Sequence, residues 1–115
     1  MSLRNDLNKI ENILSAISRI QNYIKDFDLQ SFIADDKTQD AVFRNIIIIG
    51  NSIENISKTT IEDYSDIENS QIKSISKYLS TDYFGEDNKI IWNLVSIDLL
   101  KYKEIVLEIK VKLEQ

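Results

Sequence analysis

Apolar residues recur at steps of three and four along most of the chain, and this spacing predicts helices. Between residues 3 and 27 they form one stripe, made of Leu3, Leu7, Ile10, Ile13, Leu14, Ile17, Ile20, Ile24 and Phe27. A stripe of this period indicates an amphipathic helix with one buried face. The pattern ends near residues 26–28, and residues 28–33 predict a turn or a single helical turn.

A second helix is predicted from Asp36, because Asp36-Lys37-Thr38-Gln39 has the layout of a capping box with an acidic N-cap. Its stripe consists of Val42, Ile46, Ile49, Ile53 and Ile56, widened by Phe43 and Ile47. The four isoleucines 46–49 would also suit a β-strand. Helical steps continue on both sides of them and no second strand is available for pairing, so we expect a helix.

Gly50 stands inside this second helix, where glycine costs about 1 kcal/mol relative to alanine. A close approach by another backbone would explain its presence.

The second half of the chain predicts two further helices. Residues 58–69 are polar and aperiodic, which predicts a loop, and a shorter helix follows over about 70–80 with Ile72, Ile75 and Leu79 facing inward. After a connection at 81–86, the last helix is predicted from an Asp87 N-cap to the end of the sequence. Residues 1–115 are therefore expected to form a single all-α domain, an antiparallel bundle of four main helices.

The composition narrows the chemistry that this bundle can perform. The 115 residues include no histidine and no cysteine, so disulfides, thiolate nucleophiles and the usual zinc ligand sets are excluded. Acid–base work would fall to Asp, Glu, Lys or Tyr, because the side chain whose ordinary pKa suits proton transfer near neutrality is missing.

Three acidic clusters contain the oxygen ligands that magnesium prefers. N-caps and solvated loops are built from the same residues, and this is the interpretation we favour. We therefore expect no metal and no cofactor at any of them: Asp35 with Asp36, Asp63 with Asp66, and Asp82 with Glu86 and Asp87.

The charge balance bears on partners and location. Nineteen acidic and 14 basic residues give a net charge of −5, which argues against tight, sequence-independent binding of nucleic acid but leaves a local groove possible. The first residues enter an amphipathic pattern instead of a continuous apolar leader, and apolar residues elsewhere are interrupted by charge. We expect a cytoplasmic protein with no membrane span.

Aromatic residues gather around the junction between the last two helices, over residues 76–92. Such clusters either pack into the hydrophobic core or form a surface on which a ligand binds. For Tyr83 and Phe84, spacing alone favours a packing role, in which the two rings cover one end of the bundle.

Two blocks of sequence resemble the HepT-like family of HEPN-domain proteins, and the resemblance covers nearly the whole chain. The first block is Asp36-Lys37-Thr38-Gln39-Asp40-Ala41-Val42-Phe43-Arg44-Asn45 followed by Ile48-Ile49-Gly50, and the second is Asp82-Tyr83-Phe84-Gly85 with Trp92 downstream. The resemblance implies a homodimeric α-bundle that acts as a metal-independent ribonuclease toxin. It also implies a minimal nucleotidyltransferase antitoxin as partner, which silences the toxin by attaching AMP to a tyrosine of the catalytic motif.

That motif consists of Arg, four residues, His, one residue and Tyr, with a polar residue after the Arg. Aligned on Tyr83, which would be the AMP acceptor, the chain has Ser76 at the arginine position, Lys77 after it and Thr81 at the histidine position. Asn51 replaces the glutamate that often follows the family's Ile-Gly. Neither Ser76 nor Thr81 can hold a cation or cycle a proton near pH 7, so the resemblance implies a ribonuclease scaffold with weak or lost activity.

Two alternatives remain open. An active ribonuclease would need a remodelled site that uses Lys77 and Tyr83, with Lys73 one turn earlier supplying further charge. A non-enzymatic helical module would use its dimerisation or interaction surface as its function.

Overall fold

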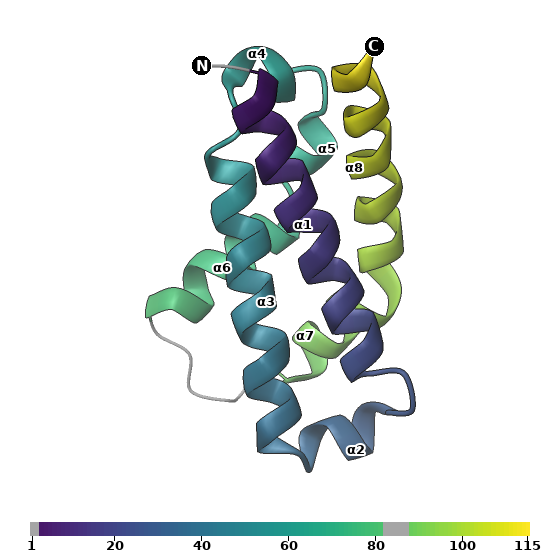
Figure 1. Ribbon diagram of the computed structural model, residues 1–115. Coiled ribbons are helices and arrows are strands. Elements are labelled where there is room, and N and C mark those ends of the chain that lie inside the picture. The colour runs from purple at the N-terminus through teal and green to yellow at the C-terminus, as the bar shows by residue number, and fades with distance from the viewer. Residues whose placement is uncertain (1–2, 82–87) are drawn as a thin grey trace.

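The computed structural model describes residues 3–81 and 88–115, and every regular element within them is a helix (Figure 1). The predicted all-α bundle is therefore confirmed. Its four main helical segments are α1, α3, α6 and the run from α7 to α8. The bounds are α1 Leu3–Tyr23, α2 Leu29–Ile33, α3 Asp36–Glu54, α4 Lys58–Ile61, α5 Ser65–Glu68, α6 Gln71–Thr81, α7 Asn88–Asn93, η1 Leu94–Asp98 and α8 Leu99–Glu114.

Helices α1 and α3 pack side by side at the centre of the bundle. Helix α6 packs on α3 and helix α8 packs on α1, so α6 and α8 lie toward opposite sides of the central pair (Figure 1). The predicted apolar stripes form the contact faces, because fully buried isoleucines from both central helices fill the core, among them Ile10, Ile13, Ile17, Ile20, Ile46 and Ile49. The isoleucine run 46–49 is helical, as predicted.

The start of α3 differs from the prediction by one residue. Asp35, not Asp36, is the N-cap, and its carboxylate accepts a hydrogen bond of 3.0 Å from the backbone N–H of Thr38. Gln39 is buried and its amide donates to the backbone carbonyls of Phe32 and Ile33, at 2.8 and 2.9 Å. Gln39 therefore ties α3 to the last turn of α2, the single turn predicted at 28–33, instead of closing a capping box.

The predicted loop at 58–69 is wrong in detail, because the structure has two short helices there, α4 and α5. Their single apolar residues, Ile61 and Ile67, are buried in the core. Asp6 of α1 holds the beginning of α4, since its carboxylate accepts from the backbone N–H of Ser57 at 3.0 Å and from the hydroxyls of Ser57 and Thr60. This contact joins residues 51 positions apart, which a local pattern does not reveal.

The Asp6 carboxylate is buried, and burial by itself raises its pKa. The hydrogen bonds from Ser57 and Thr60 together outweigh burial, and they hold the pKa of Asp6 below its ordinary value. Asp6 is therefore ionised at neutral pH while it accepts these bonds.

The final helix is not one continuous α-helix. Its described part begins at Asn88, and one π-helical turn, η1, separates α7 from α8. The predicted N-cap, Asp87, lies outside the described residues. Within the described parts of the chain, no helix is long and apolar enough to cross a membrane.

Candidate functional site

A polar cavity of about 570 Å³ opens between the second half of α3, the α5–α6 turn and α6. Its lining is rich in hydroxyl, amide and charged side chains, which suits a hydrophilic ligand better than an apolar one. The residues are Gly50, Asn51, Glu54, Glu68, Asn69, Ser70, Lys73, Ser74, Ser76, Lys77 and Ser80. Two of the four predicted motif positions, Ser76 and Lys77, therefore lie in one cavity.

Ser76 lies where α6 packs closely against Gly50 of α3. It is only 3% exposed, and its hydroxyl donates a long hydrogen bond of 3.4 Å to the backbone carbonyl of Ile47. A methyl group added at Gly50 would overlap the Oγ and Cβ of Ser76 and would lie 3.7 Å from its Cα. The close approach predicted at Gly50 is confirmed, and its neighbour is the residue at the family's arginine position.

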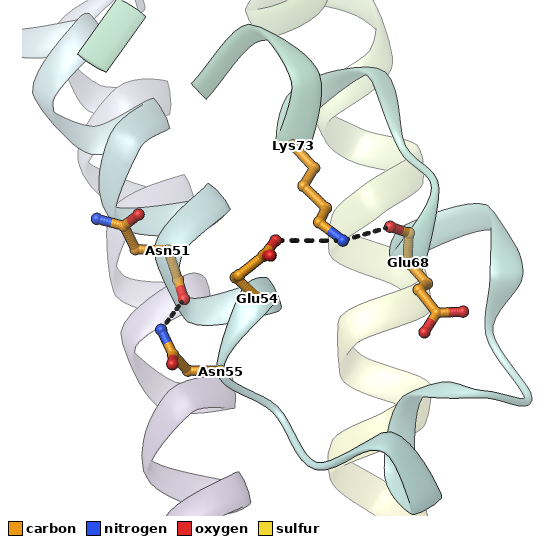
Figure 2. A network of polar contacts seen from close by, with 5 residues as sticks. All are labelled: Asn51, Glu54, Asn55, Glu68 and Lys73. Carbon is orange, nitrogen blue, oxygen red and sulfur yellow. Dashed lines mark hydrogen bonds and ion pairs between the residues drawn. The ribbon is translucent and has the colours of Figure 1, made fainter. Parts of the chain in front are cut away.

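Lys73, one turn before Ser76 on the same helix, already has two partners. Figure 2 shows that Lys73 reaches Glu54 of α3 with its ammonium 3.2 Å from Oε2, and it also donates to the backbone carbonyl of Glu68 at 3.2 Å. Below these contacts, the amide of Asn55 donates to the backbone carbonyl of Asn51 at 2.7 Å (Figure 2). The charge of Lys73 is balanced by Glu54, so Lys73 does not offer the site an uncompensated cation.

Serine hydroxyls surround the two motif positions. Ser80 is exposed and donates to the backbone carbonyl of Ser76 at 2.8 Å. Ser70, at the start of α6, is 4% exposed, and its Oγ has no hydrogen-bond partner among the described residues. Ser76 therefore contributes an uncharged hydroxyl to the cavity wall, among other serines. Lys77, the next residue, also lines the cavity and is exposed.

The block of sequence that carried the family resemblance has a structural role in this chain. Asn45 is buried, its amide donates to the backbone carbonyl of Ala41 at 2.9 Å, and its Oδ1 accepts from the guanidinium of Arg19 at 3.1 Å. With Gln39 holding α2, these polar residues fix α3 against its neighbours. Residues 36–45 of the block therefore fix the scaffold and do not line the cavity, whereas Gly50, which ends the block, does.

The other predicted site residues are not placed relative to this cavity. Thr81 is the last residue of α6, and Tyr83 lies outside the described residues, as do Phe84, Gly85 and the cluster at 82–87. Of the remaining acidic residues, Asp35 caps α3 and Asp63 pairs with Lys112 at 3.3 Å. No group of three or more potential metal ligands of the His, Cys, Asp or Glu type occurs in the described residues.

Sequence reasoning missed the acidic side of the cavity. Glu54 and Glu68 come from separate elements, and neither belongs to a recognisable motif. Once α3 and α6 are known to be neighbours, the opposite charges of Glu54 and Lys73 suggest the pair, but the sequence alone does not specify which helices touch.

Comparisons with known proteins identify the family of the chain. A family model described as ribonuclease HepT-like matches residues 13–109. A protein of Methanocaldococcus jannaschii named "Gamma-glutamylcyclotransferase and putative RNase" is 34% identical over 92% of this chain, which spans only 48% of that relative's length. A protein of Thermococcus cleftensis named "Probable ribonuclease HepT" is 30% identical over 82% of this chain and 86% of its own length.

A further relative from Methanocaldococcus jannaschii, named "Putative RNase", is 29% identical over 86% of this chain and 85% of its own length. No solved structure matches the chain significantly. The family model covers most of the sequence, including α3, the cavity and α6. The chain therefore belongs to the ribonuclease HepT-like family.

Proposed function

We propose that this chain is a HepT-like protein of a toxin–antitoxin module whose ribonuclease activity is weak or lost. The observation that carries the proposal is Ser76, a buried hydroxyl packed against Gly50 at the position where the family has its motif arginine. A hydroxyl cannot offset the charge that develops on phosphate during cleavage. With Thr81 at the histidine position, the motif also lacks its proton carrier.

Lys73, one turn before Ser76, does not compensate for the missing arginine. Lys73 contacts Glu54 and the carbonyl of Glu68, so moving it toward a phosphate would leave Glu54 beside the negatively charged substrate. We propose a cytoplasmic homodimer with a minimal nucleotidyltransferase as its partner, as the family resemblance implies.

One observation favours a second candidate, an active ribonuclease with a remodelled site. Lys77 lines the same cavity as Ser76, one position further along α6. A phosphate bound in this cavity would lie near the side chains of both Ser76 and Lys77. In this alternative, Lys77 supplies the charge and Tyr83 takes part in proton transfer.

A cleavage assay on single-stranded RNA with the purified chain decides between the two. We expect the wild-type chain to cleave RNA no faster than Lys77→Ala or Tyr83→Phe, because neither side chain replaces the missing pair. Lys25→Ala removes an exposed lysine from the turn after α1 and serves as the matched control. Efficient cleavage that Lys77→Ala or Tyr83→Phe abolishes, and Lys25→Ala leaves intact, would establish the remodelled site instead.

The partnership predicts a covalent modification. If Tyr83 remains an AMP acceptor, incubation with the cognate nucleotidyltransferase and ATP should increase the intact mass by one adenylyl group, as the tyrosine oxygen attacks the α-phosphate and pyrophosphate leaves. Tyr83→Phe should abolish the increase, whereas Tyr78→Phe, at an exposed tyrosine five residues earlier, should retain it. An unchanged mass in the wild-type chain would exclude this modification.

A further inference from the structure

An ion pair joins α3 to α6 in the wall of the polar cavity. The ammonium of Lys73 lies 3.2 Å from Oε2 of Glu54, and it donates to the backbone carbonyl of Glu68 at 3.2 Å (Figure 2). The side chain of Lys73 is 32% exposed, so this cation is partly withdrawn from water. An ammonium has three N–H donors, and these two contacts leave one of them over.

The pair lies one helical turn away from the two altered family positions, Asn51 and Ser76. Ser76 packs on Gly50, whereas the earlier residue Lys73 reaches the later residue Glu54, so α3 and α6 run in opposite directions along the cavity. Three residues along a helix span about 5 Å, and the shifts from 51 to 54 and from 76 to 73 therefore have the same direction and length. A carboxylate and a cation thus occur together one turn beyond the positions at which the family resemblance leads us to expect them.

We propose that Glu54 is an autoinhibitory residue of this cavity, which keeps the phosphate groups of RNA away from Lys73. Its carboxylate occupies the ammonium and repels any phosphate that approaches it. Figure 2 shows the carboxylate of Glu68 pointing away from Lys73, so Glu54 is the carboxylate that opposes phosphate at this lysine. The inference rests on the proposed function, because it takes this cavity as the site that faces RNA.

The charges of the cavity are those of a blocked anion site. Two acidic and two basic residues line the described part of its wall, which gives a net charge of zero: Glu54, Glu68, Lys73 and Lys77. Without the charge of Glu54 the lining has one positive charge in excess, and the carbonyl of Glu68 still holds the ammonium in place. Lysine binds phosphate as a point charge, so a held ammonium with no carboxylate beside it is a phosphate contact.

Binding of a short, fluorescently labelled single-stranded DNA tests the block apart from cleavage. DNA carries the same phosphates as RNA but has no 2′-hydroxyl that could attack them, so this measurement does not depend on ribonuclease activity. In fluorescence anisotropy at low salt, Glu54→Gln should bind about fivefold or more tightly than the wild type, because a like charge no longer faces the backbone. The ion pair is partly exposed and adds little to stability, so circular dichroism of the variant should match the wild type.

Two controls separate the cavity from the charge of the whole chain. Glu104→Gln removes one negative charge, as Glu54→Gln does, but from an exposed position of α8 that does not line the cavity, and it should bind like the wild type. Glu54→Gln combined with Lys73→Gln has the same net charge as the wild type. It should lose the gain, because the gain depends on the ammonium.

The outcomes are distinct. Binding by Glu54→Gln that is no tighter than binding by Glu104→Gln or by the wild type would overturn the block, and so would a gain that survives Lys73→Gln. The gain should shrink as the salt concentration rises, and a gain that is independent of salt would exclude charge repulsion as its cause. Efficient cleavage of RNA by the wild-type chain would instead overturn the proposed loss of activity, which the DNA measurement does not test.

Discussion

Ser76→Arg combined with Thr81→His is expected to raise RNA cleavage by about 10²-fold or more over the wild-type chain, since the loss of a positioned acid–base group typically costs 10²- to 10⁴-fold. The guanidinium would offset the phosphate charge, and the imidazole would exchange protons near neutral pH. Ser76 already lines the cavity, and Gly50 beside it has no side chain to obstruct its Cβ. Because Ser76 is buried against α3, the arginine has to extend along the part of the cavity wall that Ser76 lines, and circular dichroism checks that the double variant folds.

The measurement is the initial rate of cleavage of a labelled single-stranded RNA by each variant. Either substitution alone should gain far less than the pair, because groups that act as a unit in catalysis are strongly non-additive. The double variant should also lose activity as the pH falls or rises away from the range near 6.5 in which an unperturbed imidazole titrates, whereas the residual wild-type rate should not show this profile.

Ser80→Arg combined with Thr81→His is the matched control. Ser80 lines the same cavity one turn further along α6 and is exposed, so an arginine there adds the same charge to the same cavity at a different position. This control should remain inactive. If the Ser76 and Thr81 double variant is folded by circular dichroism and cleaves no faster than the control, the lost pair is not what limits activity.

The second large effect is expected at Gly50, where alanine should destabilise the bundle by about 1–3 kcal/mol, the usual cost of overpacking. In an exposed helix the same change would stabilise by up to about 1 kcal/mol, because glycine is a poor helix former. Here the added methyl overlaps Oγ and Cβ of Ser76, so α3 and α6 would have to separate. Urea unfolding monitored by circular dichroism measures the difference in free energy of unfolding.

A double-mutant cycle identifies the cause of this effect. Ser76→Gly removes both of the overlapped atoms, so in that background Gly50→Ala should stabilise instead of destabilise. Asn51→Ala, at the next and exposed position of α3, should change stability by no more than about 0.5 kcal/mol. Stabilisation by Gly50→Ala in the presence of Ser76 would mean that the two helices are not in close contact at this point.

Much of the fold is predictable from the sequence because its helices are strongly amphipathic. The stripes of α1 and α3 are long enough that packing and local pattern agree, and the isoleucine run 46–49 is resolved by its helical surroundings. The prediction of a loop at 58–69 is wrong because the two helices there are too short to be recognised from the sequence. The helices α4 and α5 have only four residues each, too few to show a period. They depend on the burial of Ile61 and Ile67, and α4 depends also on the contact with Asp6.

The candidate site is predictable only as far as its motif. Aligning the chain on Tyr83 selects Ser76 and Lys77, and both line the same cavity because they are neighbours on α6. The role of Glu54 in balancing Lys73 requires the packing of α6 on α3, which no local pattern encodes. The predicted N-cap of α3 differs from the observed one by one residue because Asp35 and Asp36 are both good caps, and only backbone geometry distinguishes them.

The contact between Asp6 and the Ser57–Thr60 turn has a consequence for the order in which the chain acquires structure. Neither N-cap side chain, Ser57 of α4 or Tyr64 of α5, accepts a capping hydrogen bond from a backbone N–H of its helix, and helices of four residues do not persist alone in water. The order of α4 depends on an acceptor near the beginning of the chain, Asp6, which reaches Ser57 and Thr60 only after α1 has docked and closed a loop of some fifty residues. We therefore expect the α4–α5 corner, which leads directly into the cavity wall at Glu68 and Ser70, to become ordered only after the first turns of α1 have docked.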